Sequence, residues 1–101
     1  MKITIAPQAL GDIENAVTYL RQRNPQAAGA FSDHLFKIVT QLANGEFEGP
    51  ESLLRGTRGR VRSWPLSPYR IYYRRDDGQF IVLRVYHSAR RPIARPVPTT
   101  E

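Results

Sequence analysis

The chain has 101 residues, lacks cysteine and carries a net charge of +6, so we expect one domain with one modest core and exclude disulfide and thiol chemistry. Two histidines are too few for a histidine-rich metal site, and we expect neither a metal nor another cofactor. No run of about 18 apolar residues occurs, and Met1–Ala6 is too short for a signal-peptide core, so we expect a cytoplasmic protein without a membrane span.

The first half of the chain carries the patterns of one strand and two helices. Apolar residues alternate over Met1–Ile5, which predicts a half-buried strand. Pro7 fits the first turn of a helix, and Asn24–Pro25 ends that helix and begins a second one, which stops at Asn44–Gly45. The apolar stripes of the two helices are Leu10, Ile13, Val17 and Leu20 in the first and Ala28, Phe31, Leu35, Ile38 and Leu42 in the second.

The second half predicts a connection, three strands and a tail. Glu46–Gly59 is rich in Gly, Glu and Arg, which is typical of an exposed connection. Residues 93–101 form the expected C-terminal tail, and the strands are expected near Arg60–Leu66, Tyr69–Arg75 and Gln79–His87. The predicted fold is therefore α+β, with the order β-α-α-β-β-β and a helical hairpin packed on a largely antiparallel sheet.

The turn between the last two strands can close in two registers. If Asp77–Gly78 forms a two-residue loop, Ile71 lies opposite Arg84 and both faces of the sheet mix arginines with aliphatic residues. If Asp76–Gly78 forms a three-residue loop, Arg70 lies opposite Arg84 and one face is purely apolar. We predict the second register. Its apolar face holds Tyr69, Ile71, Tyr73, Ile81, Leu83 and Val85.

The charges are divided unevenly along the chain. Residues 1–54 carry four basic side chains against six acidic ones, a net charge of −2. Residues 55–101 carry eleven arginines against three acidic residues, a net charge of +8. A basic half of this kind indicates a surface that meets nucleic acid or an acidic protein segment. The alternative is a solvated surface in a chain that uses arginine freely.

The other face of the predicted hairpin is basic and aromatic. Two arginines that lie opposite each other repel unless an anion sits between them, so Arg70 and Arg84 indicate a phosphate or carboxylate site. Tyr72 and Tyr86 beside them could stack on bases or on a partner's side chains. The alternative is a solvated face on which arginine stems cover apolar surface. This predicted face holds Arg70, Tyr72, Arg74, Val82, Arg84 and Tyr86.

Several motifs resemble the RelE/ParE superfamily of type II toxin–antitoxin toxins, and the ParE-like branch most. The C-terminal ending and the long helical hairpin carry the likeness to that branch. The resemblance implies one toxin domain over residues 1–92. The motifs are A-x-x-D-I-x-x-A-x-x-Y-L at Ala9–Leu20, P-x-A-A at Pro25–Ala28, YRIYYR at Tyr69–Arg74 and VLRVYHSARRP at Val82–Pro92.

The resemblance implies a growth-inhibiting toxin with a plasmid- or chromosome-stabilising role and a cognate antitoxin as its partner. ParE-like members inhibit DNA gyrase and block replication, whereas RelE-like members cleave mRNA on the ribosome. We expect a non-enzymatic gyrase inhibitor, with a ribosome-dependent endoribonuclease as the alternative. A degenerate, non-toxic relative that only binds an antitoxin is a third possibility.

Two sets of site residues follow from these alternatives. A nuclease would use Glu46, Glu48 or Glu51 as base and His87 as acid, with arginines on the phosphate. A lone histidine is more often structural, and the predicted register turns His87 toward the helices. The full nuclease set is Arg70, Arg84, Tyr86, His87 and Arg90. The residues expected to bind the target or the antitoxin are Arg60, Arg62, Arg70, Tyr72, Arg74, Arg84, Tyr86, Arg90 and Arg91.

Overall fold

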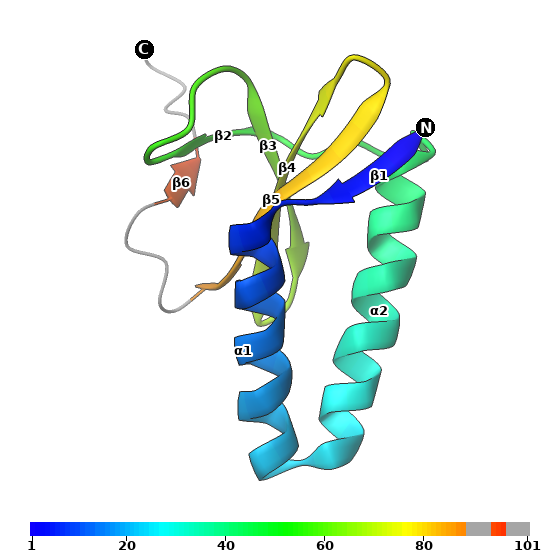
Figure 1. The fold of residues 1–101 in the computed structure, drawn as a ribbon, viewed down its shortest axis with the longest axis vertical. Coiled ribbons are helices and arrows are strands. Elements are labelled where there is room, and N and C mark those ends of the chain that lie inside the picture. The colour runs from blue at the N-terminus through cyan, green and yellow to red at the C-terminus, as the bar shows by residue number, and fades with distance from the viewer. Residues whose placement is uncertain (89–93, 97–101) are drawn as a thin grey trace.

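The computed structural model describes residues 1–88 and 94–96 (Figure 1). Two helices pack on one mixed sheet, which confirms the predicted α+β class. No helix within the described ranges is long and apolar enough to cross a membrane. In chain order the elements are β1 (Lys2–Ile5), α1 (Pro7–Arg23), α2 (Pro25–Ala43), β2 (Glu51–Leu54), β3 (Val61–Leu66), β4 (Tyr69–Asp76), β5 (Gln79–His87) and β6 (Ala94–Pro96).

The strands form one sheet in the order β1-β5-β4-β3-β2-β6. β1 runs parallel to β5 and the other pairs are antiparallel, so the sheet is largely antiparallel as predicted. The sequence patterns predict neither β2, which lies in the expected connection, nor β6, which lies in the expected tail. β2 has only four residues and two of them are exposed, so it carries little strand signal of its own. Pairing with β3 and β6 on its two sides makes it a strand.

The two helices begin and end where the sequence predicts. The Asn24 side chain accepts hydrogen bonds from two backbone N–H groups in the first turn of α2, at 3.1 and 3.3 Å. α1 packs on the sheet chiefly through Ala9 and Ala16, which are buried, while Leu10 of the predicted stripe is 50% exposed. The small alanine side chains allow α1 to lie close to β5.

The main core lies between the helical hairpin and the facing side of β4 and β5. The rings of Tyr73 and Phe80 stack there, with centroids 4.8 Å apart. A second, smaller cluster joins β2, β3 and β4, and its buried members are Leu54, Val61 and Tyr72.

The turn between β4 and β5 differs from the predicted three-residue loop. Asp77–Gly78 is a two-residue turn in which both residues have positive φ, at 49° and 76°, as a type I′ turn requires. The prediction of three loop residues is therefore wrong. Close to the turn, the buried residues of β5 are Phe80 and Val82, and the predicted Ile81 is only partly buried.

A bulge at Leu83 then changes the pairing by one residue along the rest of the hairpin. The register shifts between Tyr72 and Tyr73, so Arg84 lies opposite Tyr72. Arg70 lies opposite Tyr86, and the predicted pair of facing arginines is wrong. Leu83 packs against the smaller cluster instead of the main core. The bulge restores Val85 to the main core, as predicted.

Candidate functional site

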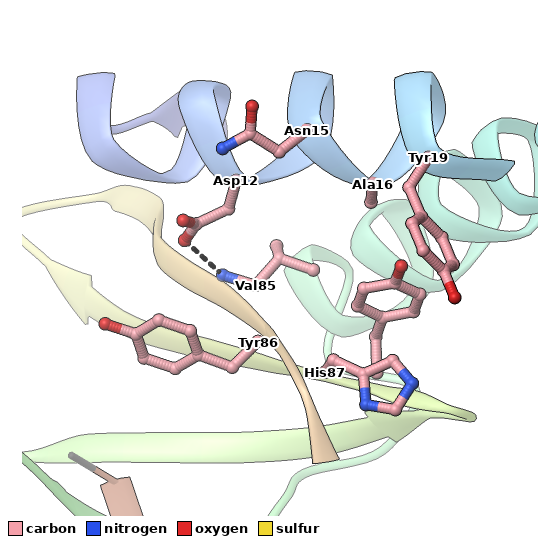
Figure 2. Close-up of a pocket in the computed structure, with 8 residues that line it drawn as sticks. Asp12, Asn15, Ala16, Tyr19, Val85, Tyr86 and His87 are labelled. Atoms are coloured by element: carbon pink, nitrogen blue, oxygen red, sulfur yellow. Dashed lines mark hydrogen bonds between the residues drawn. The ribbon is translucent and has the colours of Figure 1, made fainter. Parts of the chain in front are cut away.

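The junction between α1 and β5 is held by one carboxylate. Arg84 Nε donates to Asp12 Oδ2 at 2.8 Å, and Arg84 Nη2 donates to Asp12 Oδ1 at 2.9 Å. The backbone N–H of Val85 also donates to Asp12 Oδ2, at 3.0 Å (Figure 2). β1 pairs with β5 only as far as Ile5 and Val82. Beyond that point the Asp12 carboxylate, and not β1, accepts the hydrogen bond from the Val85 N–H of β5. Arg84 is therefore a structural cation rather than the free phosphate ligand predicted.

A hollow of about 410 Å³ lies beside this junction, between α1 and the end of β5 (Figure 2). The Arg84 guanidinium lies 4.4 Å from the centroid of the Tyr86 ring, a cation–π contact. Burial raises the pKa of Tyr86, and the nearby Arg84 charge opposes that shift. His87 meets the ring of Tyr69 edge-on, with centroids 5.1 Å apart. Tyr69 belongs to the main core, so the His87 ring lies against the edge of that core.

Two other residues of the predicted basic face have structural partners. Arg70 Nε donates to Ser63 Oγ at 2.8 Å, and Ser63 Oγ also lies 2.8 Å from Ser52 Oγ. Tyr72 is only 2% exposed, so the prediction that it stacks on a base or a partner is wrong. Its burial follows from β2, which the sequence did not predict and whose Leu54 belongs to the same cluster.

Three more of the predicted arginines, Arg60, Arg62 and Arg74, gather at the other end of β4. We call the hollow of about 160 Å³ that they line the arginine pocket, formed by Glu48, Arg60, Arg62, Arg74 and Arg75. Glu48 bonds to two of them: Arg62 Nε lies 3.0 Å from Oε2, and Arg75 donates to Oε1. Arg75 also donates to the backbone carbonyl of Leu42, at the end of α2. No sequence pattern indicated Arg75 as a site residue or predicted this structural role of Glu48.

The hydroxyl of Tyr73 links the core to the arginine pocket. It accepts a hydrogen bond from the Gly49 N–H at 2.9 Å and donates to Glu48 Oε1 at 3.3 Å. Burial is the main cause that raises the pKa of Tyr73. A raised pKa in the folded state means that the neutral phenol stabilises the fold below about pH 10 and that this contribution is lost as pH rises through the folded pKa.

We expect Tyr73→Phe to unfold about 1–2 kcal/mol more easily at pH 7, because the Gly49 N–H and Glu48 lose a partner. The variant should also lose less stability than the parent between pH 9 and pH 11. Urea titrations across this pH range measure both effects. If the parent and the variant lose the same stability between pH 9 and pH 11, ionisation of Tyr73 does not cause the loss.

An apolar groove lies on the opposite side of the molecule from β2, between β1 and the helices. Its volume is about 340 Å³. Phe36 is 73% exposed beside it and Ile3 is 39% exposed, although large apolar side chains are usually buried. β1 is the outermost strand here, so within the described part of the chain one of its edges has no strand partner. The groove is lined chiefly by Ile3, Ile5, Ile13, Leu35, Phe36 and Val39.

A known family of proteins matches this chain, with its helical hairpin, sheet and arginine-rich strands. Residues 3–92 match the family model described as the ParE toxin of the type II toxin–antitoxin system parDE. The chain belongs to the ParE toxin family. No curated protein matches the sequence.

The ParE fold is also found in a solved structure described as the chromosomal ParDE TA system from P. aeruginosa. The two chains superpose with a TM-score of 0.70 and share 18% sequence identity. The match covers 86% of the present chain and 95% of the solved one. At this identity the likeness establishes the fold, and the family model establishes the ParE membership.

In this ParE-type toxin Glu48 and His87 of the nuclease alternative are not brought together. Arg70 does lie opposite Tyr86, and Arg84 contacts the Tyr86 ring. Glu48 contacts Tyr73, whereas His87 pairs with Tyr69, four residues away along β4. That separation is about 13 Å at the usual rise of a strand. Arg84 is bound by Asp12. Of the other predicted residues, Arg90 and Arg91 lie outside the described residues.

Proposed function

We propose that this ParE-type toxin inhibits DNA gyrase in the cytoplasm, thereby blocks replication, and is neutralised by a cognate antitoxin that binds the apolar groove. Its role is then to stabilise the plasmid or chromosomal region that encodes the pair. We assign the activity to residues 1–92. Membership of the ParE family and the ParDE system of the structural relative support this proposal.

The apolar groove is the observation that carries the antitoxin half of the proposal. An exposed sheet edge beside exposed apolar side chains invites another chain to pair with it. A segment of the antitoxin could add a strand to β1 and place alternate apolar side chains against Ile3, Ile5 and Phe36. Lys37, which is exposed and follows Phe36 in α2, favours an acidic segment there.

Phe36→Ala is expected to weaken antitoxin binding by at least about tenfold, because a large apolar side chain at the centre of an interface is a typical hot spot. Since Phe36 is 73% exposed in the free toxin, the variant should keep its thermal stability and its toxicity. Calorimetric titration with the cognate antitoxin gives the affinity.

Leu53→Ala is the matched control for Phe36→Ala. Leu53 is a similarly exposed apolar residue, at 52%, but lies on β2, remote from the apolar groove. The control should bind the antitoxin as the parent does. If Phe36→Ala binds equally well, the antitoxin does not occupy the groove.

A pair of assays tests the gyrase half of the proposal. Purified toxin is added to a gyrase supercoiling reaction and, separately, to ribosomes translating a defined mRNA. We expect supercoiling to stop and the mRNA to remain intact. Codon-specific cuts with normal supercoiling would reject gyrase inhibition in favour of the endoribonuclease. Normal growth of cells that express the chain without an antitoxin would instead indicate a degenerate relative.

A further inference from the structure

The arginine pocket is assembled from two neighbouring strands. Arg62 lies on β3 opposite Tyr73 of β4, so Arg74 and Arg75 follow directly alongside it. Arg60 stands just before β3 and is exposed, with 82% of its side chain accessible. The sheet therefore holds four guanidinium groups around one hollow of about 160 Å³.

The acidic residues near the pocket do not balance its charge. Glu48 binds Arg62 and Arg75, and Glu51 lies 2.7 Å from Arg60. Two carboxylates thus stand against four guanidinium groups, which always carry their charge. The pocket keeps two positive charges in excess, enough for one phosphate group.

Arg74 has the least satisfied guanidinium of the pocket. Its Nη1 donates to the backbone carbonyl of Arg58 at 2.7 Å, which provides no negative charge. Its Nε is buried and has no hydrogen-bond partner among the described residues. A buried donor without an acceptor normally costs free energy. Because the structure pairs Arg74 with a carbonyl and with no carboxylate among the described residues, its charge is available to an anion that enters the pocket.

The surroundings of the pocket favour a nucleic-acid backbone over a single carboxylate. Glu48 already supplies the pocket with a carboxylate from the chain itself. The loop before β3 continues the positive surface through Arg55 and Arg58, both exposed, so successive anionic groups can be met. The pocket is lined by arginines and one glutamate, so it presents no aromatic ring to a base and its contacts are to phosphates.

We propose that the arginine pocket binds a phosphate of the DNA backbone, without regard to base sequence, with Arg60 and Arg74 as its principal ligands. The proposal rests on gyrase inhibition in one respect, because it places the bound toxin against the DNA that gyrase holds. Direct DNA binding by the purified toxin can nevertheless be measured without gyrase.

The test uses fluorescence anisotropy with a labelled 20-base-pair duplex of mixed sequence over a range of salt concentrations. The double variant Arg60→Gln/Arg74→Gln should bind about tenfold more weakly and show a salt slope smaller by about 1. The control Arg21→Gln/Arg23→Gln removes the same charge from the end of α1 and should bind as the parent does. Arg60→Gln alone, at an exposed position, keeps the test valid if the double variant unfolds.

Two results would overturn the phosphate site. Equal effects of the pocket and control variants would mean that only net charge matters. Unchanged DNA binding together with weaker antitoxin binding would assign the pocket to the protein partner. Failure of the proposed gyrase inhibition can be told apart from failure of the phosphate site. If the parent toxin binds DNA but leaves supercoiling untouched, and the pocket variants bind DNA more weakly, the proposed function is rejected and the phosphate site is retained.

Discussion

Replacing Gly49 with alanine is expected to lower the free energy of unfolding by about 3 kcal/mol, by forcing a tightly packed backbone apart. A Cβ atom on Gly49 would lie 1.7 Å from the carbonyl oxygen of Ser63, which is backbone and cannot rotate away. The shift would disturb the bond from the Gly49 N–H to Tyr73 and the bond from Arg62 to the Gly49 carbonyl. Gly49 therefore couples β3 to the arginine pocket.

Urea unfolding of Gly49→Ala and of the control Gly11→Ala measures this effect. A Cβ on Gly11 would meet no atom within 4 Å, and Gly11 lies inside α1. The control should be neutral or stabilised by up to about 1 kcal/mol, since alanine favours helix over glycine. Equal stability of Gly49→Ala and the parent would show that the β3 backbone moves aside at little cost.

Asp12→Ala is expected to destabilise the fold by about 2–3 kcal/mol. The side chains of Asp12 and Arg84 are only 13% and 23% exposed, so removal of the carboxylate leaves a largely buried cation without its partner. The Val85 N–H loses its acceptor as well. In the parent, the hydrogen bonds that Arg84 donates to Asp12 raise the pKa of Arg84. In the variant the guanidinium still keeps its proton, because arginine stays charged in proteins, so it cannot escape the cost by becoming neutral.

A double-mutant cycle with Arg84→Met measures the interaction free energy between Asp12 and Arg84. The double variant should be more stable than the sum of the single effects allows, by more than about 1 kcal/mol, because it leaves no unpaired charge. Glu14→Ala, at an exposed position of the same helix, serves as the control and should change stability by less than about 0.5 kcal/mol. Additive single effects would mean that Asp12 and Arg84 act independently.

The elements predicted best are those whose signals lie within a few residues. Asn24 and Pro25 mark a helix boundary by local chemistry, and both helices follow from their own apolar spacing. The hairpin register failed because the bulge at Leu83 cannot be seen in the alternation of β5 alone. The predicted register requires side chains to alternate between the two faces without interruption along β5, whereas the bulge shifts this alternation by one residue.

The candidate site was harder to predict because its partners are distant in the sequence. Arg84 and Asp12 are 72 residues apart, and Arg75 and Glu48 are 27 residues apart. Spacing along the chain identifies arginines but not the carboxylates that neutralise them. The useful signal was the uneven charge: an acidic first half and a basic second half can form such pairs only across the folded molecule.

The parallel pairing of β1 with β5 has a consequence for the order of events during synthesis. Ile3 of β1 pairs with Phe80 of β5, and Asp12 of α1 binds Arg84 of β5. These contacts of β1 and α1 can therefore form only after β5 has been synthesised. Contacts so distant in sequence form late and slowly. We therefore expect nascent chains that stop before residue 79 to be unfolded and harmless, with toxicity and the apolar groove arising together once β5 leaves the ribosome.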